Sequence, residues 1–445
     1  MKQYNILDYG AIADGVTNNA AAIQQAIDEA SAEGGRVVIP QGKYLSGTLV
    51  LKSNIDFHLE KGAVLISSLN QEDIMDFAKL FEDDNACTGW DGGCFLFACH
   101  EENITISGEG VIYGQGDKVF IDDDVDGGAH ECPLSVTAFR PRTTFLEDVT
   151  NLTVRDITIQ DAAFWTLHMA GCHHVRVQDI KILNDVRGAN NDGIDPDCCK
   201  DVLITGCLVK TGDDAIVIKT TKPMTQRYGA SENIVISNCI LYSHDSALKI
   251  GTETHGAIRN VILSDCVIKD CSRGVGIWVR DGATIEDVHI HHVTGNVLKY
   301  ADGIGEHRTR MWWGNGEPIF LNATYRNGEH HNPGKIRNIT FDHIYMKAES
   351  SIFAAGEKDA VIENVQLTDL NITMCHQGTQ PSGYFDEQPS EKNVYEHTIP
   401  AVYGRYAEDL VVTGRVHYEE PYNVESNPIQ QLDNCKNTQI SMQEV

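Results

Sequence analysis

Short segments that alternate apolar and polar residues recur along most of the chain, with starts separated by 23 (175 − 152) to 32 (234 − 202) residues. Each begins with Asn, Asp or His, as in Asn151-Leu152-Thr153-Val154 and Asn233-Ile234-Val235-Ile236. The period of two predicts β-strands, and no helical period of 3.6 separates successive units. Because such short strands cannot bury an apolar face alone, we expect them to stack as rungs of a solenoid.

The expected fold class is all-β, a right-handed parallel β-helix. Two-residue Asn-Gly or Asp-Gly turns between paired strands are scarce, which argues against a β-sandwich. No compositional break suggests a linker, so residues 1–445 are predicted to form a single domain. Three cysteines at equivalent repeat positions, Cys207, Cys239 and Cys266, are expected to stack inside the solenoid as reduced thiols.

A solenoid needs covered ends, and residues 1–50 are expected to supply an N-terminal cap and the first rungs. Residues 20–33 carry Ile23, Ala26, Ile27 and Ala30 on one helical face, and Gly34-Gly35 follow. This pattern predicts a capping helix.

Two stretches are longer than one rung requires. Residues 70–100 are one, and the 51 residues (339 − 288) between Val288 and Ile339 contain the other. Because solenoid insertions cluster on the binding face, residues 298–337 are predicted to form an inserted loop over a cleft. Residues 376–445 are expected to hold C-terminal rungs and a tail.

Three acids stand out against this repeat. Asp213 and its neighbour Asp214 lie 21 residues (213 − 192) and 22 residues (214 − 192) after Asp192, close to one rung. Stacked rungs would therefore bring three carboxyls together, and such acids cannot all ionise at neutral pH. Paired carboxyls with different pKa values perform glycoside hydrolysis. Asp195 and Asp197 are expected to be ordinary polar turn residues.

The amino-acid composition argues against some classes of binding partner. The formal charge of −29 argues against nucleic acid and an anionic membrane surface as partners. No signal-peptide h-region precedes the repeat, so we expect a cytoplasmic protein with reduced cysteines. Cys198-Cys199 lacks the spacing of a zinc site, and Asp122–Asp126 lacks that of a calcium loop, so no metal and no cofactor are expected.

The motifs Asn190-Asn191-Asp192-Gly193 and Gly212-Asp213-Asp214 resemble those of the polygalacturonase family, glycoside hydrolase family 28. Residues 164–168 are similar to a segment common in its bacterial members, and residues 9–15 resemble the N-terminal cap of the pectate-lyase superfamily. The resemblance implies an inverting hydrolase in which Asp213 protonates the leaving oxygen. Asp192 and Asp214 would then hold and deprotonate the attacking water. Inversion usually separates acid and base carboxyls by ~6.5–9.5 Å.

The chain departs from the family pattern where basic residues grip the carboxylate of the leaving-side sugar. Ser246 stands at the position of the family's histidine, with His244 two residues away, and Gly276-Ile277-Trp278 replaces Arg-Ile-Lys. We expect either substitution by other cations or a neutral leaving sugar such as rhamnose. Candidate substrate-binding residues here are His244, Lys249, Arg273, Trp278 and Arg280.

Further binding candidates come from the loop and from the rung before the acids. In the loop, aromatic faces and bidentate donors suit an acidic sugar; on the preceding rung, ring and amide side chains are expected to line the subsite of the cleaved sugar. The candidates are Arg308, Arg310, Trp312 and Trp313 in the loop, with Trp165, His168 and Asn190 near the acids.

We therefore expect an exo-acting hydrolase of pectin-derived galacturonan or rhamnogalacturonan oligosaccharides. One alternative is a polysaccharide lyase, although Lys219 would point away from Asp214 on a regular strand. A non-catalytic carbohydrate-binding β-helix is the other. The oligomeric state stays open.

Overall fold

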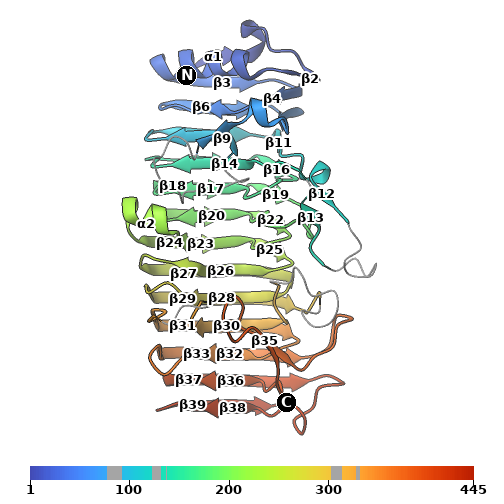
Figure 1. Cartoon of the computed structure of the whole chain (residues 1–445), viewed down its shortest axis with the longest axis vertical. Coiled ribbons are helices and arrows are strands. Elements are labelled where there is room, and N and C mark those ends of the chain that lie inside the picture. Colours follow the sequence, from blue (N-terminus) through green and yellow to red (C-terminus); the bar gives the residue numbers. More distant parts are fainter. Residues whose placement is uncertain (78–92, 123–131, 137, 302–312, 327–330) are drawn as a thin grey trace.

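The computed structural model describes the chain except residues 78–92, 123–131, 137, 302–312 and 327–330. Its strands stack on one another in parallel along a single axis, one rung after another from the N-terminus to the C-terminus (Figure 1). The right-handed parallel β-helix predicted from the repeat is confirmed.

One wall of the solenoid carries the functional residues described below. It is a sheet of 13 strands in which β8 (Met75–Asp76) pairs antiparallel with β9. The others run in parallel in the order β5 (Leu49–Val50), β9 (Gly93–Cys99), β14 (Arg142–Glu147), β17 (Leu167–Ala170), β20 (Ile194–Asp197), β23 (Ile216–Thr220), β26 (Ser246–Thr254), β28 (Arg273–Val279), β30 (Glu317–Ala323), β32 (Ile352–Ala355), β36 (Val402–Arg405) and β38 (Gln430–Asp433).

The remaining walls form a second sheet of 22 strands. From β27 onward, most of its strands continue around the corner between two walls without a break. The strands are β1 (Lys2–Asn5), β2 (Asp14–Asn18), β3 (Gly35–Ile39), β4 (Gly42–Ser46), β6 (Ile55–Leu59), β7 (Ala63–Ser67), β10 (Ile104–Gly108), β11 (Val111–Tyr113), β15 (Thr153–Arg155), β16 (Thr158–Gln160), β18 (His173–Gln178), β19 (Lys181–Leu183), β21 (Lys200–Thr205), β22 (Leu208–Thr211), β24 (Ser231–Ser237), β25 (Ile240–Ser243), β27 (Ile258–Cys271), β29 (Thr284–Val297), β31 (Lys335–Ala348), β33 (Ile362–Met374), β37 (Ala407–Tyr418) and β39 (Gln439–Glu444).

Helix α1 (Ala20–Glu33) lies at the N-terminal end of the stack (Figure 1). It buries Ile23, Ala26, Ile27 and Ala30, the four residues of the predicted apolar face. No helix in the described ranges is both long enough and apolar enough to cross a membrane. The smaller elements are α2 (Lys222–Tyr228), η1 (Ile6–Tyr9), η2 (Gln71–Asp73), η5 (Gly116–Lys118), and the antiparallel pairs β12 (Phe120–Ile121) with β13 (Ser135–Val136) and β34 (Tyr384–Asp386) with β35 (Val394–Glu396).

The Asn or Asp that opens each repeat occupies a tight corner. Asn233 and Asn260 have φ values of 61° and 56°, a left-handed conformation that Asn tolerates better than most residues. Their side chains also form a ladder, because Asn260 donates to Asn233 at 2.9 Å and Asn233 donates to Asp201 at 2.9 Å. The repeat phrase therefore marks the corners as well as the strands.

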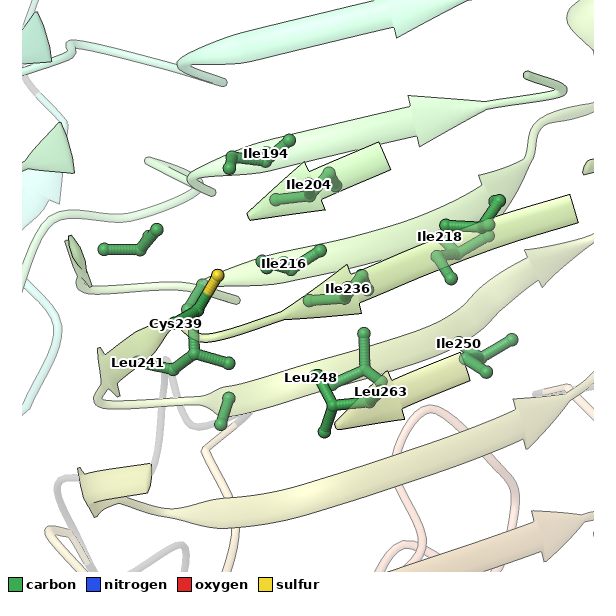
Figure 2. Packing of buried hydrophobic residues seen from close by; sticks show 14 of the residues in the cluster. Ile194, Ile204, Ile216, Ile218, Ile236, Cys239, Leu241, Leu248, Ile250 and Leu263 are labelled. Carbon is green, nitrogen blue, oxygen red and sulfur yellow. The ribbon is translucent and has the colours of Figure 1, made fainter. Parts of the chain in front are cut away.

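The core is a continuous column of apolar side chains inside the coil. Ile194, Ile216 and Leu248 follow one another on β20, β23 and β26, opposite a second column on the facing wall (Figure 2). Cys239 packs in this interior (Figure 2). Cys207 and Cys266 are buried on the neighbouring rungs. The expected stack of reduced cysteines is therefore present.

The structure adds detail to two of the predicted segments. Residues 298–337 include a regular strand, β30 at Glu317–Ala323, between β28 and β32. Residues 376–445 hold the β34–β35 hairpin followed by rungs whose strands continue to Glu444. That hairpin becomes important at the site.

Candidate active site

The three acids lie together on two adjacent rungs. Ile194 of β20 pairs with Ile216 of β23, which sets Asp192 beside Asp214, and the Gly193 amide donates to the Asp214 carbonyl at 2.9 Å. One carboxyl oxygen from each of Asp192, Asp213 and Asp214 lies within 4.8 Å of the other two. The acids are 2%, 5% and 1% exposed, respectively. The rung spacing in the sequence thus predicted a real cluster.

Asp213 and Asp214 reach the same cluster because they precede the regular strand, which begins at Ile216. Asn191 fixes the bend: its Oδ1 accepts from the amides of Gly212 at 2.8 Å and Asp213 at 3.1 Å. The Ser243 hydroxyl donates to the Asp213 carbonyl at 2.6 Å. Nothing in the motif had singled out Asn191 for this supporting role.

Two lysines face the acids. Lys219 Nζ lies 3.4 Å from Asp192 Oδ2, and Lys249 Nζ lies 2.9 Å from Asp214 Oδ2. Among the described residues, Asp213 forms no ion pair. The expectation that Lys219 points away from Asp214 is wrong, because the strand alternation on which it rested begins only after Asp214.

The acids titrate as a coupled set. Burial raises the pKa of Asp213 to about 7, with Asp192 and Asp245 adding like-charge repulsion. Burial also raises the pKa of Asp192, although Lys219 opposes the rise, and raises that of Asp214 to about 8 against the effect of Lys249. Each ammonium favours the ionised form of its own partner, yet burial keeps the pKa of Asp214 above that of Asp213. What distinguishes Asp213 is that its pKa is raised without an ion-pair partner among the described residues.

Asp195 and Asp197 are not the ordinary polar turn residues that we expected. Both lie in β20 and are fully buried. Asp195 Oδ1 is 3.9 Å from Lys219 Nζ, and Asp197 accepts from the Thr221 amide at 2.9 Å and hydroxyl at 2.6 Å. Burial, and then Asp192, raise the pKa of Asp195 well above its ordinary value. Asp195 thus belongs to the electrostatic surroundings of the site.

A cavity of about 620 Å³ opens over the acids. That volume suits a small-molecule ligand, since such pockets measure roughly 300–1,000 Å³. It is lined by Trp165, Asn190, Asp192, Asp213, Asp214, Lys219, Lys249, Thr252, Glu253, Arg273, Trp278, Arg326, Gln388, Pro389 and Asn393.

The departures from the family pattern have a geometric consequence on β28. Gly276 leaves room for the Trp278 indole, because a Cβ at residue 276 would lie 2.1 Å from a ring carbon of that indole. Lys249 Nζ lies 5.2 Å from the Trp278 ring centre. Arg273 lines the cavity but is bound by Asp245 at 3.4 Å and Glu317 at 3.4 Å. An indole therefore takes the place of a basic side chain.

Four predicted binding residues are not among the described residues that line the cavity. His168 is buried 3.6 Å from Asp197, and burial lowers its pKa to about 4. His244 stacks on Tyr300 at 3.7 Å and also contacts Trp313, whose indole nitrogen donates to the Gly212 carbonyl at 2.9 Å. Arg280 donates to the backbone carbonyls of Glu387 and Pro389.

The structure thus shows contacts within the protein for these four residues, and their contact with substrate stays a prediction. Arg308, Arg310 and Trp312 lie outside the described residues.

Residues that the sequence had not indicated complete the lining. Lys219 Nζ lies 3.4 Å from Asp192 and 3.8 Å from Glu253, and it also lies 4.3 Å from the Trp165 ring centre. Arg326 pairs with Asp281 at 2.8 Å. The period-two alternation of β23 could have predicted that Lys219 faces the cavity, if Asp213 and Asp214 had been placed before the strand rather than in it.

The acid oxygens are closer than the ~6.5–9.5 Å expected for an inverting pair, since they lie within 4.8 Å of one another. Such a group could in principle ligate a cation. Two ammonium groups already neutralise Asp192 and Asp214, however, so the arrangement does not resemble a cation site.

Comparison with known proteins gives the family. The profile of Glycosyl hydrolases family 28 matches residues 35–384, and that of Rhamnogalacturonase A/epimerase, pectate lyase-like, matches residues 3–65. A probable polygalacturonase of Vitis vinifera is 27% identical over 72% of this chain and 67% of its own length.

Two shorter matches extend the comparison. An exo-poly-alpha-D-galacturonosidase of Dickeya chrysanthemi is 26% identical over 57% of this chain. Rhamnogalacturonase A of Aspergillus niger is 29% identical over 44% of it. The matches span 48% and 36% of those two relatives.

Solved structures share the fold. A hyperthermoactive exopolygalacturonase from Thermotoga maritima has a TM-score of 0.65 and 21% identity, covering 86% of this chain and 89% of its own. A family 28 exopolygalacturonase from Yersinia enterocolitica has a TM-score of 0.68 and 18% identity, covering 98% and 78%. With the family profile matched over most of the rungs and the acids gathered over a cavity, the chain belongs to glycosyl hydrolases family 28 and is a glycoside hydrolase.

Proposed function

We propose that this enzyme hydrolyses a glycosidic bond of pectin-derived oligosaccharides with inversion, releasing a terminal sugar. Asp213 donates its proton to the departing glycosidic oxygen. Asp192 and Asp214 hold one water, and one of them takes its proton as the water oxygen attacks the anomeric carbon. The hydrolysed bond leaves one new hydroxyl on each fragment.

The division of charge among the acids carries this proposal. Asp192 and Asp214 each have an ammonium partner and are thereby suited to act as carboxylates. Within the described part of the chain, one buried oxygen of each, Asp192 Oδ1 and Asp214 Oδ1, has no hydrogen-bond partner. Two such acceptors can receive both hydrogens of one water, while Asp213 keeps the proton that an acid catalyst needs.

The short spacing of the acids makes stereochemistry the decisive test. Retaining enzymes place their two carboxyls ~5–5.5 Å apart, and distance alone would suit that class. Inversion is supported instead by the pairing of two acids on the water. Proton NMR of the first product detects which anomer is released, and a retained configuration would contradict the water mechanism.

Pectin-derived substrates are supported by the relatives, which include polygalacturonases and a rhamnogalacturonase. The leaving-side sugar is proposed to be neutral, as rhamnose is. Among the described residues that line the cavity, each cation is bound by carboxylates: Lys219, Lys249, Arg273 and Arg326 all have acidic partners. Trp278 offers a ring face where a carboxylate-binding side chain would otherwise stand.

A substrate panel tests the sugar. Defined galacturonan and rhamnogalacturonan oligosaccharides are incubated with the enzyme and with Asp213→Asn, and the products are identified by mass spectrometry. We expect cleavage at a galacturonosyl–rhamnose bond at a rate at least tenfold above a galacturonosyl–galacturonate bond. The opposite preference would overturn the neutral leaving sugar, while no cleavage of either series would overturn the pectic substrate.

A β-eliminating lyase is not favoured. Such an enzyme needs a basic side chain that is neutral at its working pH. Burial alone would lower the pKa of Lys219, but Asp192 and Glu253 raise it above its ordinary value. Lys249 is raised likewise by Asp214 and Asp245. Both lysines are therefore charged and unsuited to abstract a proton.

A cytoplasmic location is kept as a proposal. It is supported by the twelve cysteines of the described chain, which are all free thiols.

A further inference from the structure

The antiparallel hairpin β34–β35 returns to the active site from far along the chain. Tyr384 pairs with Glu396 and Asp386 with Val394. The connection between these strands brings Gln388, Pro389 and Asn393 into the lining of the cavity. In Figure 1, β35 overlies the wall near β30 and β32. This hairpin therefore covers the rungs that follow the acids.

Two buried arginines on β28 and immediately after it hold the connection in place. Arg280 is 1% exposed and donates to the carbonyls of Glu387 at 3.2 Å and Pro389 at 3.0 Å. Arg273 is 2% exposed and lies 3.7 Å from the Asp386 carboxyl. These guanidiniums were candidates for gripping substrate, but they bind the protein's own chain instead.

The base of the hairpin is fixed by further charge-assisted contacts. Arg405 of β36 forms a bidentate pair with Glu387, with both N–O distances at 2.7 Å. Asn322 of β30 donates to the same carboxyl at 2.8 Å. Bidentate pairs and buried amides of this kind resist displacement, so the hairpin is a fixed wall rather than a loosely attached loop.

The position of the wall limits the substrate. A sugar chain lying along the solenoid crosses successive rungs about 4.8 Å apart, and Trp278 lies two rungs beyond Asp213, or about 10 Å. Beyond Trp278 the groove meets Gln388, Pro389 and Asn393. Because Trp278 is assigned to the leaving side, the groove on that side of the acids is short.

Resting on the proposed function, we propose that the connection from Asp386 to Asn393 is the specificity wall that ends the leaving-side subsites. Arg280 and Arg273 are its positioning residues. The enzyme then accepts a leaving group no longer than a mono- or disaccharide, so its substrates are short oligosaccharides rather than internal bonds of a polymer.

Chain-length dependence tests the wall directly. Oligosaccharides with one common terminal sugar and a leaving group of increasing length are assayed for kcat/KM. For the wild-type enzyme, we expect a fall of at least tenfold once the leaving group exceeds a disaccharide. In a variant with residues 388–393 replaced by Gly-Asn-Gly, the ratio of kcat/KM for long over short substrates should rise at least tenfold.

Arg280→Met should raise the same ratio, and Arg280→Lys should restore part of the discrimination. Arg337→Met is the matched control, since Arg337 forms a partly exposed pair with Glu286 at 2.6 Å and its loss should leave the ratio unchanged. Because Arg280→Met could unfold the protein, the double variant Gln388→Ala/Asn393→Ala, which leaves the arginine contacts intact, provides the second measurement.

The outcomes separate the wall from the proposed function. If the wild-type enzyme cleaves short and long substrates equally well, or no hairpin variant changes the ratio, the wall is overturned while the hydrolase stands. If no pectic oligosaccharide of any length is cleaved, the proposed substrate fails instead. A rapid fall in polygalacturonate viscosity would reveal internal cleavage by the wild-type enzyme and would also overturn the wall.

Discussion

Single residues give the three acids of the site different electrostatic surroundings. Lys219 and Lys249 neutralise Asp192 and Asp214, and no ammonium among the described residues pairs with Asp213. Three similar carboxyls at one site thereby acquire different properties from their neighbours alone. The same reasoning explains why substitutions at these positions should have distinguishable effects.

Asp213→Asn and Asp192→Asn should each lower kcat by about 10²–10⁴-fold, because each removes a group that transfers or accepts a proton. Steady-state hydrolysis of the best substrate in the panel measures this. Asp265→Asn, at an exposed corner, is the control and should keep normal turnover. Near-normal activity in Asp213→Asn would contradict the assigned roles.

Stability should depend on pH through Asp213. Its folded pKa of about 7 exceeds the ordinary value of 3.8, so between these values the folded state binds the proton more tightly than the unfolded state. Stability from this group is therefore present at low pH and is lost as pH rises from about 4 to 7. Asp213→Asn should raise the melting temperature relative to wild type at pH 8 and by less at pH 4; equal differences would contradict the pKa assignment.

Lys219→Met should shift the acidic limb of the pH–rate profile to higher pH by about one unit. Removing the ammonium raises the pKa of Asp192, so the carboxylate that holds water forms only at higher pH. The pH dependence of kcat/KM measures this shift, with Lys269→Met at an exposed position as the control. A loss of activity that is uniform across pH would indicate a purely structural role.

Elements differ in how far the sequence predicted them. The alternating phrase predicted the rungs, and the apolar face of residues 20–33 predicted α1, because both patterns follow from burial of one face. The acid cluster followed from rung spacing. The β34–β35 hairpin could not be predicted, since Arg280 holds it through backbone carbonyls that leave no pattern in side-chain identity. The environment of Asp195 was predicted wrongly, because a strand that is covered on both faces buries its polar residues as well.

The corner ladder should contribute to stability at each rung. Asn233→Ala removes the contacts with Asp201 and Asn260 and puts alanine at a φ of 61°, which should lower stability by about 1–2 kcal/mol. Thermal unfolding followed by circular dichroism measures the loss. Asn233→Gly tolerates the φ and should recover part of it. If the Asn233→Ala and Asn233→Gly variants have the same melting temperature, backbone strain is not the cause of the lost stability.

The whole molecule is strongly acidic, with a formal charge of −29. This field opposes the approach of anionic sugars, and the cations in the cavity are already bound by carboxylates. Approach to such a surface should depend on ionic strength, because the Debye length shortens from about 30 Å at 0.01 M to about 8 Å at 0.15 M salt.

We therefore expect KM for a uronate-bearing oligosaccharide to fall severalfold when salt rises from about 0.01 M to 0.15 M. The methyl-esterified form of the same oligosaccharide is the control, and its KM should not change with salt if it is a substrate. A KM for the anionic substrate that rises with salt would show that attraction, not repulsion, governs its approach.

The close packing of Gly276 and Trp278 also restricts the mutations by which this enzyme could change its substrate preference. A side chain at residue 276 would collide with the indole, whose ring carbon lies 2.1 Å from the position of the new Cβ. An ancestor or descendant with arginine there must first, or simultaneously, exchange the tryptophan for something smaller. The two positions are thus epistatic, and only one mutational order avoids a damaged intermediate.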